Sequence, residues 1–130
     1  MRPRTPDFEG SYVVVADEDW TTANFVIETL GSDGHLVFWA YDGLSAVRLA
    51  LGLKFCDLVI SNSRVSGQPG VHLIRELRDR LPWLSILYLA NAQRSSPVLE
   101  QQLPSNVPIL REPFTAVELR VAVAPLLRQA

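Results

Sequence analysis

Short apolar runs alternate with longer amphipathic segments along most of the chain. The runs are rich in Val, Ile and Leu and contain no Asp, Glu, Lys or Arg, which is the pattern of parallel strands buried on both faces. We therefore predict strands at residues 12–16, 35–40, 58–61, 84–89 and 107–110.

Between these runs, apolar residues recur at helical spacing. The predicted helices cover residues 20–30, 44–53, 71–81, 97–103 and 115–127. The periodicity places Phe25 on the buried face of the first helix and Leu51 on that of the second. Thr115 precedes the last helix, where its hydroxyl can accept a hydrogen bond from the first turn.

The alternation of strand and helix predicts a doubly wound α/β fold. Each strand returns to a parallel neighbour through a right-handed crossover, and such crossovers cover both faces of an open sheet. Pro108 cannot donate a backbone hydrogen bond, so the fifth strand should lie at an edge. Ligands of these sheets bind at the carboxyl ends of the strands. The polar or small residues at those ends are Asp17, Glu18, Asn62, Ala90 and Glu112.

Composition limits the size and class of the protein. At 130 residues, of which 48% are hydrophobic, we expect a flexible N-terminus at residues 1–10 and a single domain at residues 11–130. The net charge of −2, with acids and bases interspersed, argues against a nucleic-acid partner. No apolar run is long enough to cross a bilayer, so no membrane association is expected. The one cysteine, Cys56, fits a reducing compartment, and we expect a cytoplasmic protein.

The segment 56–70, CDLVISNSRVSGQPG, follows an apolar strand with polar residues and a Gly/Pro loop. It resembles the third strand and following loop of response-regulator receiver domains, the phosphorelay proteins of two-component systems. The resemblance extends over residues 11–127. It implies a flavodoxin-like (CheY-like) sheet of five parallel strands in the order 2-1-3-4-5. In that family an aspartate at the strand tip takes phosphate from a histidine kinase, and here Asn62 stands in its place.

Of the family's other functional positions, the acidic pair is retained in this chain and three further positions differ. Asp17 and Glu18 match the acidic pair that holds Mg²⁺. Ala90 stands where the family has a Ser or Thr whose hydroxyl meets the phosphoryl group, and Glu112 replaces the lysine of a Lys-Pro-Phe turn. Ile109 stands where the family usually has a switch aromatic.

These departures predict a degenerate receiver, or pseudo-receiver. Transfer to a receiver needs a carboxylate nucleophile, a metal ion, and a cation with a hydroxyl to stabilise the developing charge. The amide of Asn62 is neutral and a poor nucleophile. We therefore expect no enzyme and no catalytic residue, but an atypical single-domain response regulator that works without phosphorylation. Its partner would be a histidine kinase, another signalling protein, or a second copy of the chain.

Two alternatives remain open at this stage. A regulator could be phosphorylated at an unusual residue, for which Ser61, Ser63 and Asp57 are the candidates. A flavodoxin-like fold could instead bind a small ligand or cofactor. Asp17 and Glu18 also have a plainer interpretation, as caps and favourable charges at the start of the first helix.

The acidic pocket needs a positive charge if no metal enters it. Asp17, Glu18 and Glu112 would crowd like charges there, and the only lysine, Lys54, precedes the third strand. Arg64 follows Asn62 closely and is the first candidate, with Arg111 second. We expect a guanidinium to bond to one of these carboxylates, no cofactor, and little or no binding of Mg²⁺, for which Asp17 and Glu18 are the weak candidates.

The last helix carries a second apolar row besides the one that faces the sheet. Val117, Val121 and Pro125 follow this row, and Ile109 lies nearby if the family's arrangement holds. We predict that these residues form the interaction face, with scattered surface valines as the plainer interpretation. Pro125 should also kink or end the helix near Ala124.

Overall fold

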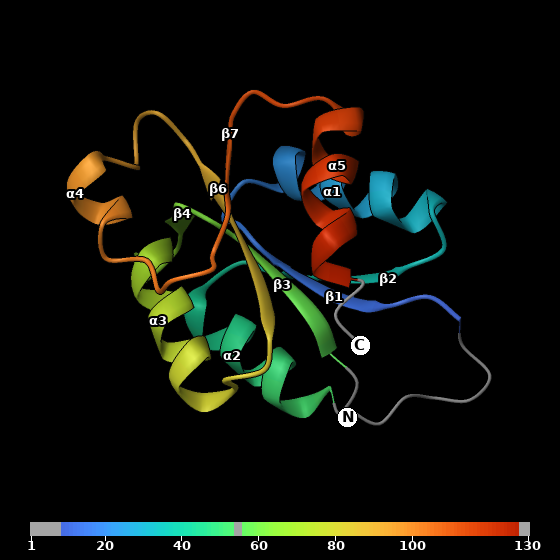
Figure 1. Cartoon of the computed structure of the whole chain (residues 1–130), viewed down its shortest axis with the longest axis horizontal. Coiled ribbons are helices and arrows are strands. Elements are labelled where there is room, and N and C mark those ends of the chain that lie inside the picture. Colours follow the sequence, from blue (N-terminus) through green and yellow to red (C-terminus); the bar gives the residue numbers. More distant parts are fainter. Residues whose placement is uncertain (1–8, 54–55, 128–130) are drawn as a thin grey trace.

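The computed structural model describes residues 9–53 and 56–127. Its centre is a five-stranded parallel sheet in the order β2-β1-β3-β6-β7 (Figure 1). The strands are β1 (Tyr12–Ala16), β2 (Leu36–Ala40), β3 (Cys56–Asn62), β6 (Ser85–Ala90) and β7 (Ile109–Arg111). When only the strands of this sheet are numbered, in chain order, their spatial order is 2-1-3-4-5, so the predicted fold class is confirmed.

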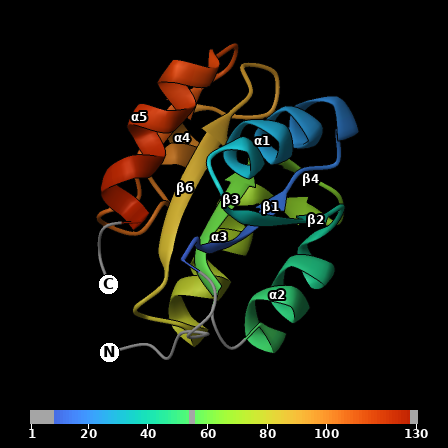
Figure 2. The ribbon, with the colours of Figure 1, turned by 90° about the vertical axis from the view of Figure 1, so that its right-hand side faces the viewer.

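Helices cover both faces of the sheet. They are α1 (Trp20–Ser32), α2 (Gly43–Gly52), α3 (Gly70–Arg80), α4 (Pro97–Glu100) and α5 (Ala116–Leu127). Helices α1 and α5 lie on one face, and α2 and α3 lie on the other (Figure 2). Within the described ranges, no helix is long and apolar enough to cross a membrane.

Each central strand contributes side chains to two separate cores. In β1, Val13 and Val15 face the α1/α5 side, whereas Val14 and Ala16 face the α2/α3 side. β3 is buried at every position. Because successive side chains point to opposite faces and both faces are covered, an uninterrupted apolar run is needed.

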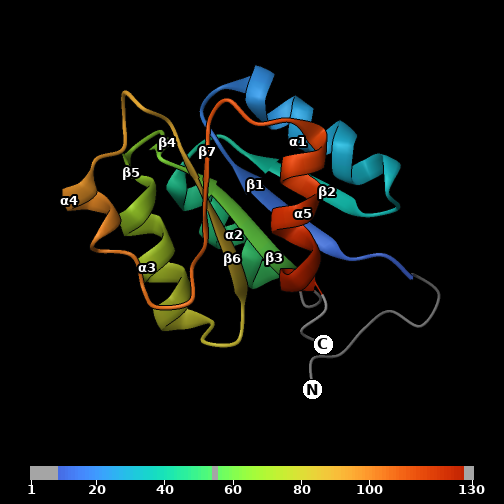
Figure 3. The same cartoon turned by 45° about the horizontal axis from the view of Figure 1, so that its top comes forward.

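The edges of the sheet are more exposed than its centre. β7 is an edge strand, as Pro108 predicts, and the Pro108 carbonyl accepts a hydrogen bond from Tyr88 N at 3.0 Å. After β3 the chain forms a small antiparallel pair, β4 (Arg64–Val65) with β5 (Gln68–Pro69), which leads directly into α3 (Figure 3). This pair holds the loop beside the carboxyl end of β3.

Some predicted details of the helices are wrong. The buried face of α1 consists of Ala23, Val26, Thr29 and Leu30, whereas Phe25 is exposed at the rim, where its ring packs against Phe114. Leu51 is likewise exposed on α2. α4 is only one turn long and has no buried residue to extend it.

The last helix does not end at Ala124. α5 continues through Pro125 to Leu127, because Leu126 is buried against the sheet and its carbonyl accepts a hydrogen bond from Ser85 Oγ at 3.0 Å. Thr115 caps this helix as predicted. Its Oγ1 accepts from Glu118 N, and Glu118 Oε1 accepts from Thr115 N, which is a reciprocal capping box.

Candidate functional site

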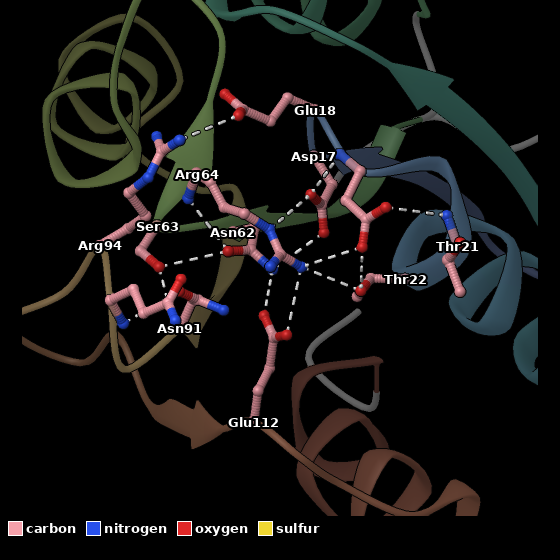
Figure 4. A network of polar contacts seen from close by, with 12 residues as sticks. Asp17, Glu18, Thr21, Thr22, Asn62, Ser63, Arg64, Asn91, Arg94 and Glu112 are labelled. Atoms are coloured by element: carbon pink, nitrogen blue, oxygen red, sulfur yellow. Dashed lines mark hydrogen bonds and ion pairs between the residues drawn. The ribbon is translucent and has the colours of Figure 1, made fainter.

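The carboxyl ends of three strands bring Asp17, Asn62 and Glu112 together. Asp17 follows β1, Asn62 is the last residue of β3, and Glu112 follows β7. Parallel strands end at the same edge of a sheet, so residues far apart in the sequence become neighbours there. Figure 4 shows these side chains pointing toward one another.

Asn62 is fully buried and bridges the two acids. Its side-chain nitrogen donates to Asp17 Oδ2 at 2.9 Å and to Glu112 Oε2. Its side-chain oxygen accepts from Arg64 N at 3.0 Å and from Ser63 Oγ at 3.2 Å. An ionised carboxylate only accepts hydrogen bonds, so only the amide nitrogen can face Asp17 and Glu112. The amide therefore links two acids that would otherwise repel each other.

Arg64 supplies the positive charge of the site. Its Nε lies 3.5 Å from Asp17 Oδ1, and its Nη2 lies 3.2 Å from Glu112 Oε1 and 3.4 Å from Asp19 Oδ2 (Figure 4). Nη2 also donates to Thr22 Oγ1 at 2.9 Å. The expected guanidinium contact with a pocket carboxylate is thus present. The single guanidinium of Arg64 forms ion pairs with three carboxylates.

The backbone around Asp17 fixes its carboxylate and changes its acidity. Oδ1 of Asp17 accepts a hydrogen bond from Asp19 N at 2.9 Å, and the side chain is fully buried. Burial raises the pKa of Asp17 to about 6, although the Asp19 N–H and the Arg64 guanidinium lower it. Asp17 is therefore mostly ionised at neutral pH and becomes protonated in mildly acidic solution.

Glu18 lies apart from the Arg64 cluster. Its carboxylate turns to the other side of the loop and pairs with Arg94 at 3.3 Å (Figure 4). The prediction of an acidic pocket that includes Glu18 needs this correction: side chains of adjacent residues diverge where the chain leaves a strand. Arg111, the second candidate for the cation, pairs with Glu100 at 2.7 Å.

Asp19 and Thr22 belong to the site although the sequence pattern did not predict them there. Asp19, rather than Asp17 or Glu18, is the N-cap of α1: it accepts from Thr21 N at 3.3 Å and from Thr22 Oγ1 at 3.0 Å. An acidic residue directly before a predicted helix, followed by threonines, is a cap signal and could have been recognised. That these residues also reach Arg64 follows only from the fold.

The neighbouring loops hold the cluster in place. Ala90 ends β6, and its carbonyl accepts from Glu112 N at 2.9 Å, so its contribution is through the backbone. Ser63 Oγ accepts from Asn91 N at 2.8 Å while it donates to Asn62. Among the residues that the structure describes, no group of three or more His, Cys, Asp or Glu side chains is arranged to hold a metal ion.

The predicted interaction face is exposed. Val117 and Val121 on α5 are 65% and 68% exposed, Ile109 on β7 is 37% exposed, and Pro125 is also exposed. These positions are therefore available for contact, which is a requirement of an interface.

The fold defines the class of protein. No protein-family model matches the sequence. Among solved structures, a response regulator receiver protein from Sinorhizobium medicae is similar with a TM-score of 0.81 and 25% identity, covering 92% of this chain and 96% of that one. The chain has the fold of response-regulator receiver domains.

Two further solved structures place this fold in different contexts. The chemotaxis protein CheY4 of Vibrio cholerae is similar with a TM-score of 0.79 and 24% identity, covering 91% of this chain and 99% of that one. NtrX from Brucella abortus, crystallised with ADP, is similar with a TM-score of 0.78 and 19% identity, covering 92% of this chain. Our chain spans only 27% of the length of NtrX.

Proposed function

We propose that this chain is an atypical response regulator of two-component signalling that does not use phosphoryl transfer and acts by binding other proteins. The observation that carries the proposal is the bonding of Asn62. Its amide donates to both Asp17 and Glu112 at the place where a receiver needs a free carboxylate. The site is therefore organised around a neutral bridge.

Phosphoryl transfer lacks its chemical requirements in this arrangement. Asn62 offers no anionic oxygen to attack phosphorus, and Ala90 offers no hydroxyl. Glu112 adds negative charge where a phosphoryl group would need a cation, and loss of one such electrostatic group costs roughly 10²–10³-fold in rate. We infer that the chain is not an enzyme and accepts no phosphate at this site.

The neighbouring side chains are poor substitutes as phosphate acceptors. Ser61 is fully buried and its Oγ donates to the Asn62 carbonyl, while Ser63 is 4% exposed and bonded to Asn62 and Asn91. Asp57 is 2% exposed and accepts from Tyr12 N near the opposite end of β3. None of the three presents a free nucleophilic oxygen to solvent.

The residues of the site do not fit the Mg²⁺ ion that receivers hold. A magnesium ion needs free carboxylate oxygens in octahedral geometry. Here Arg64 and Asn62 already bond to the oxygens of Asp17 and Glu112, and Glu18 is paired with Arg94. We infer that Arg64 neutralises the acids in place of a divalent cation.

The experiment is phosphorylation from a small donor. The full chain is incubated with acetyl phosphate or phosphoramidate and MgCl₂, beside a functional receiver as positive control, and intact mass is measured. We expect the control to gain a phosphoryl group and this chain to remain unmodified. Stoichiometric phosphorylation of the folded chain would overturn the proposal, and peptide mapping would then identify Ser61, Ser63 or Asp57.

We further propose that Ile109, Val117, Val121 and Pro125 form the contact surface for the protein partner, a histidine kinase or another signalling protein, or for a second copy of the chain. The support is their exposure on β7 and α5, away from the buried face formed by Leu119, Val123 and Leu126. An apolar row on the solvent side of a helix is stabilised when a partner covers it.

A further inference from the structure

A second exposed surface lies at the other edge of the sheet and consists of aromatic side chains. We call Trp20, Trp39 and Tyr41 the aromatic patch. Trp20 begins α1, Trp39 lies in the edge strand β2, and Tyr41 follows that strand. Trp20 and Trp39 have ring centroids 4.9 Å apart, and Trp39 and Tyr41 have centroids 6.2 Å apart in an edge-to-face arrangement.

These rings pack against one another and yet remain in contact with solvent. Trp20, Trp39 and Tyr41 are 51%, 38% and 52% exposed. Trp39 is the central ring, and its Nε1 donates to the Asp17 carbonyl at 2.8 Å, which fixes its orientation. Because the polar group of Trp39 is satisfied inside the protein, its exposed ring surface is available to a partner without loss of a hydrogen bond.

Acidic residues adjoin two members of the patch in the sequence. Asp19 precedes Trp20 and has a side chain that is 42% exposed, and Asp42 follows Tyr41 and is half-buried. Among the described residues Asp42 accepts a hydrogen bond from Ser45 N but forms no ion pair, although Arg48 of the same helix acts on it electrostatically. The patch therefore combines π faces with negative charge.

We propose that the aromatic patch binds a positively charged segment of a protein partner by stacking an arginine guanidinium on its rings, with Asp42 and Asp19 as the complementary charges. Guanidinium groups prefer the faces of Trp and Tyr, and Trp, Tyr and Arg dominate the energetics of protein interfaces. The two carboxylates would repel the phosphates of a nucleic acid, which disfavours base stacking as the use of these rings.

This surface is separate from the one formed by β7 and α5. β2 and β7 are the opposite edges of the sheet, so a partner can occupy the aromatic patch without covering Val117 or Val121. Asp19 also pairs with Arg64 at 3.4 Å, but the inference does not rest on Asn62 or on the absence of phosphoryl transfer. It can therefore fail while the proposed function stands, and the reverse is also true.

The test uses a glycine-spaced peptide with two arginines and a matched peptide in which citrulline replaces arginine. Citrulline keeps the planar shape and removes the charge. Binding is followed through the indole N–H resonances of the full chain in NMR spectra. We expect the arginine peptide to shift the signals of Trp20 and Trp39, to leave the signal of Trp83 near the opposite end of the sheet unchanged, and to bind more tightly than the citrulline peptide.

Two variants separate the rings from the charge. Trp20→Ala should weaken binding of the arginine peptide by about twofold to fivefold, the range of an exposed cation–π contact. Asp42→Asn should weaken it as well, and because asparagine is an equally good N-cap, α2 should stay folded. Trp83→Ala is the control that removes an exposed tryptophan elsewhere and should leave binding unchanged.

Several outcomes would overturn the inference. These are an absence of binding by the arginine peptide, equal binding of the citrulline peptide, and an equal loss in Trp83→Ala. A single-stranded oligonucleotide that binds the same rings more tightly than the peptide would assign the patch to nucleic acid instead.

Discussion

Asn62 and Asp17 lie 45 residues apart in the sequence, and the side-chain nitrogen of Asn62 donates to Asp17 Oδ2 over 2.9 Å. An ionised aspartate at position 62 could not make this contact, because a carboxylate only accepts hydrogen bonds. The same nitrogen donates to Glu112. Restoring the receiver's aspartate would therefore disrupt the site rather than repair it.

Asn62→Asp should destabilise the protein at neutral pH. The change places a further carboxylate among buried acids, and an uncompensated buried charge of this kind costs roughly 3–5 kcal/mol. Protonation relieves the repulsion, so the loss should shrink between pH 7 and pH 5. Urea unfolding at both pH values measures it. Asn62→Ala is the control, since it loses the hydrogen bonds without adding charge; equal losses for the two variants at pH 7 would contradict the argument.

Arg64→Met should lower the free energy of unfolding by roughly 2–4 kcal/mol, because it leaves Asp17, Asp19 and Glu112 without their shared cation. It should also create binding of Mg²⁺, which we expect to be weak or absent in the unmodified chain. Isothermal titration calorimetry with MgCl₂ compares the two proteins.

The matched control for this change is Arg111→Met. It breaks the pair between Arg111 and Glu100, in which the Arg111 side chain is 65% exposed, so the loss should stay below about 1 kcal/mol. Tight Mg²⁺ binding by the unmodified chain would show that Arg64 does not substitute for the metal.

Asp17 should make stability depend on pH in a defined window. Its pKa rises from 3.8 to about 6 on folding, so the folded state holds the proton more tightly than the unfolded state. Protonated Asp17 therefore contributes to the stability of the folded state fully below about pH 4, and this contribution is lost as the pH rises through about 6. The shift corresponds to an upper value of roughly 3 kcal/mol.

The measurement is the free energy of unfolding of the unmodified chain minus that of Asp17→Asn, followed from pH 4 to pH 7. Taking the difference cancels carboxylates that both proteins share, including Asp42 and Glu100, whose lowered pKa values act in the opposite direction. We expect the difference to fall with rising pH and then to level off. A flat difference across the window would exclude the burial of Asp17 as a source of pH dependence.

Val121→Glu combined with Val117→Lys should abolish partner binding or self-association without unfolding the chain. Both side chains are largely exposed, so the stability should change by no more than about 0.5 kcal/mol. Sedimentation equilibrium measures self-association. Capture of the native partner by the immobilised chain measures partner binding.

Leu51→Glu serves as the control for this face, because Leu51 is an exposed apolar residue on α2, which covers the opposite side of the sheet. The control should retain association. If the folded double variant keeps its oligomeric state and its partner, the face formed by Ile109, Val117, Val121 and Pro125 is wrongly assigned.

The sheet and the residues at its carboxyl ends could be predicted from the amino-acid sequence alone. A strand covered on both faces needs a continuous apolar run, as in Tyr12–Ala16. The runs that form β1, β3, β6 and β7 are followed in the chain by the residues that lie at the site. Asp17, Asn62 and Glu112 could be placed there because parallel strands share one direction. Arg64 could be predicted as the cation because unpaired acids at one edge need a positive charge within reach.

Only the tertiary structure decided how neighbouring side chains divide between environments. Glu18 follows Asp17 directly but turns to Arg94, while Asp19 turns back to Arg64. Phe25 fits a buried helical face in the sequence, yet it lies at the rim because the angle at which α1 packs on the sheet selects the buried row. Sequence periodicity gives the spacing of apolar residues along a helix. Which of the possible apolar rows is buried depends on the surface against which the helix packs.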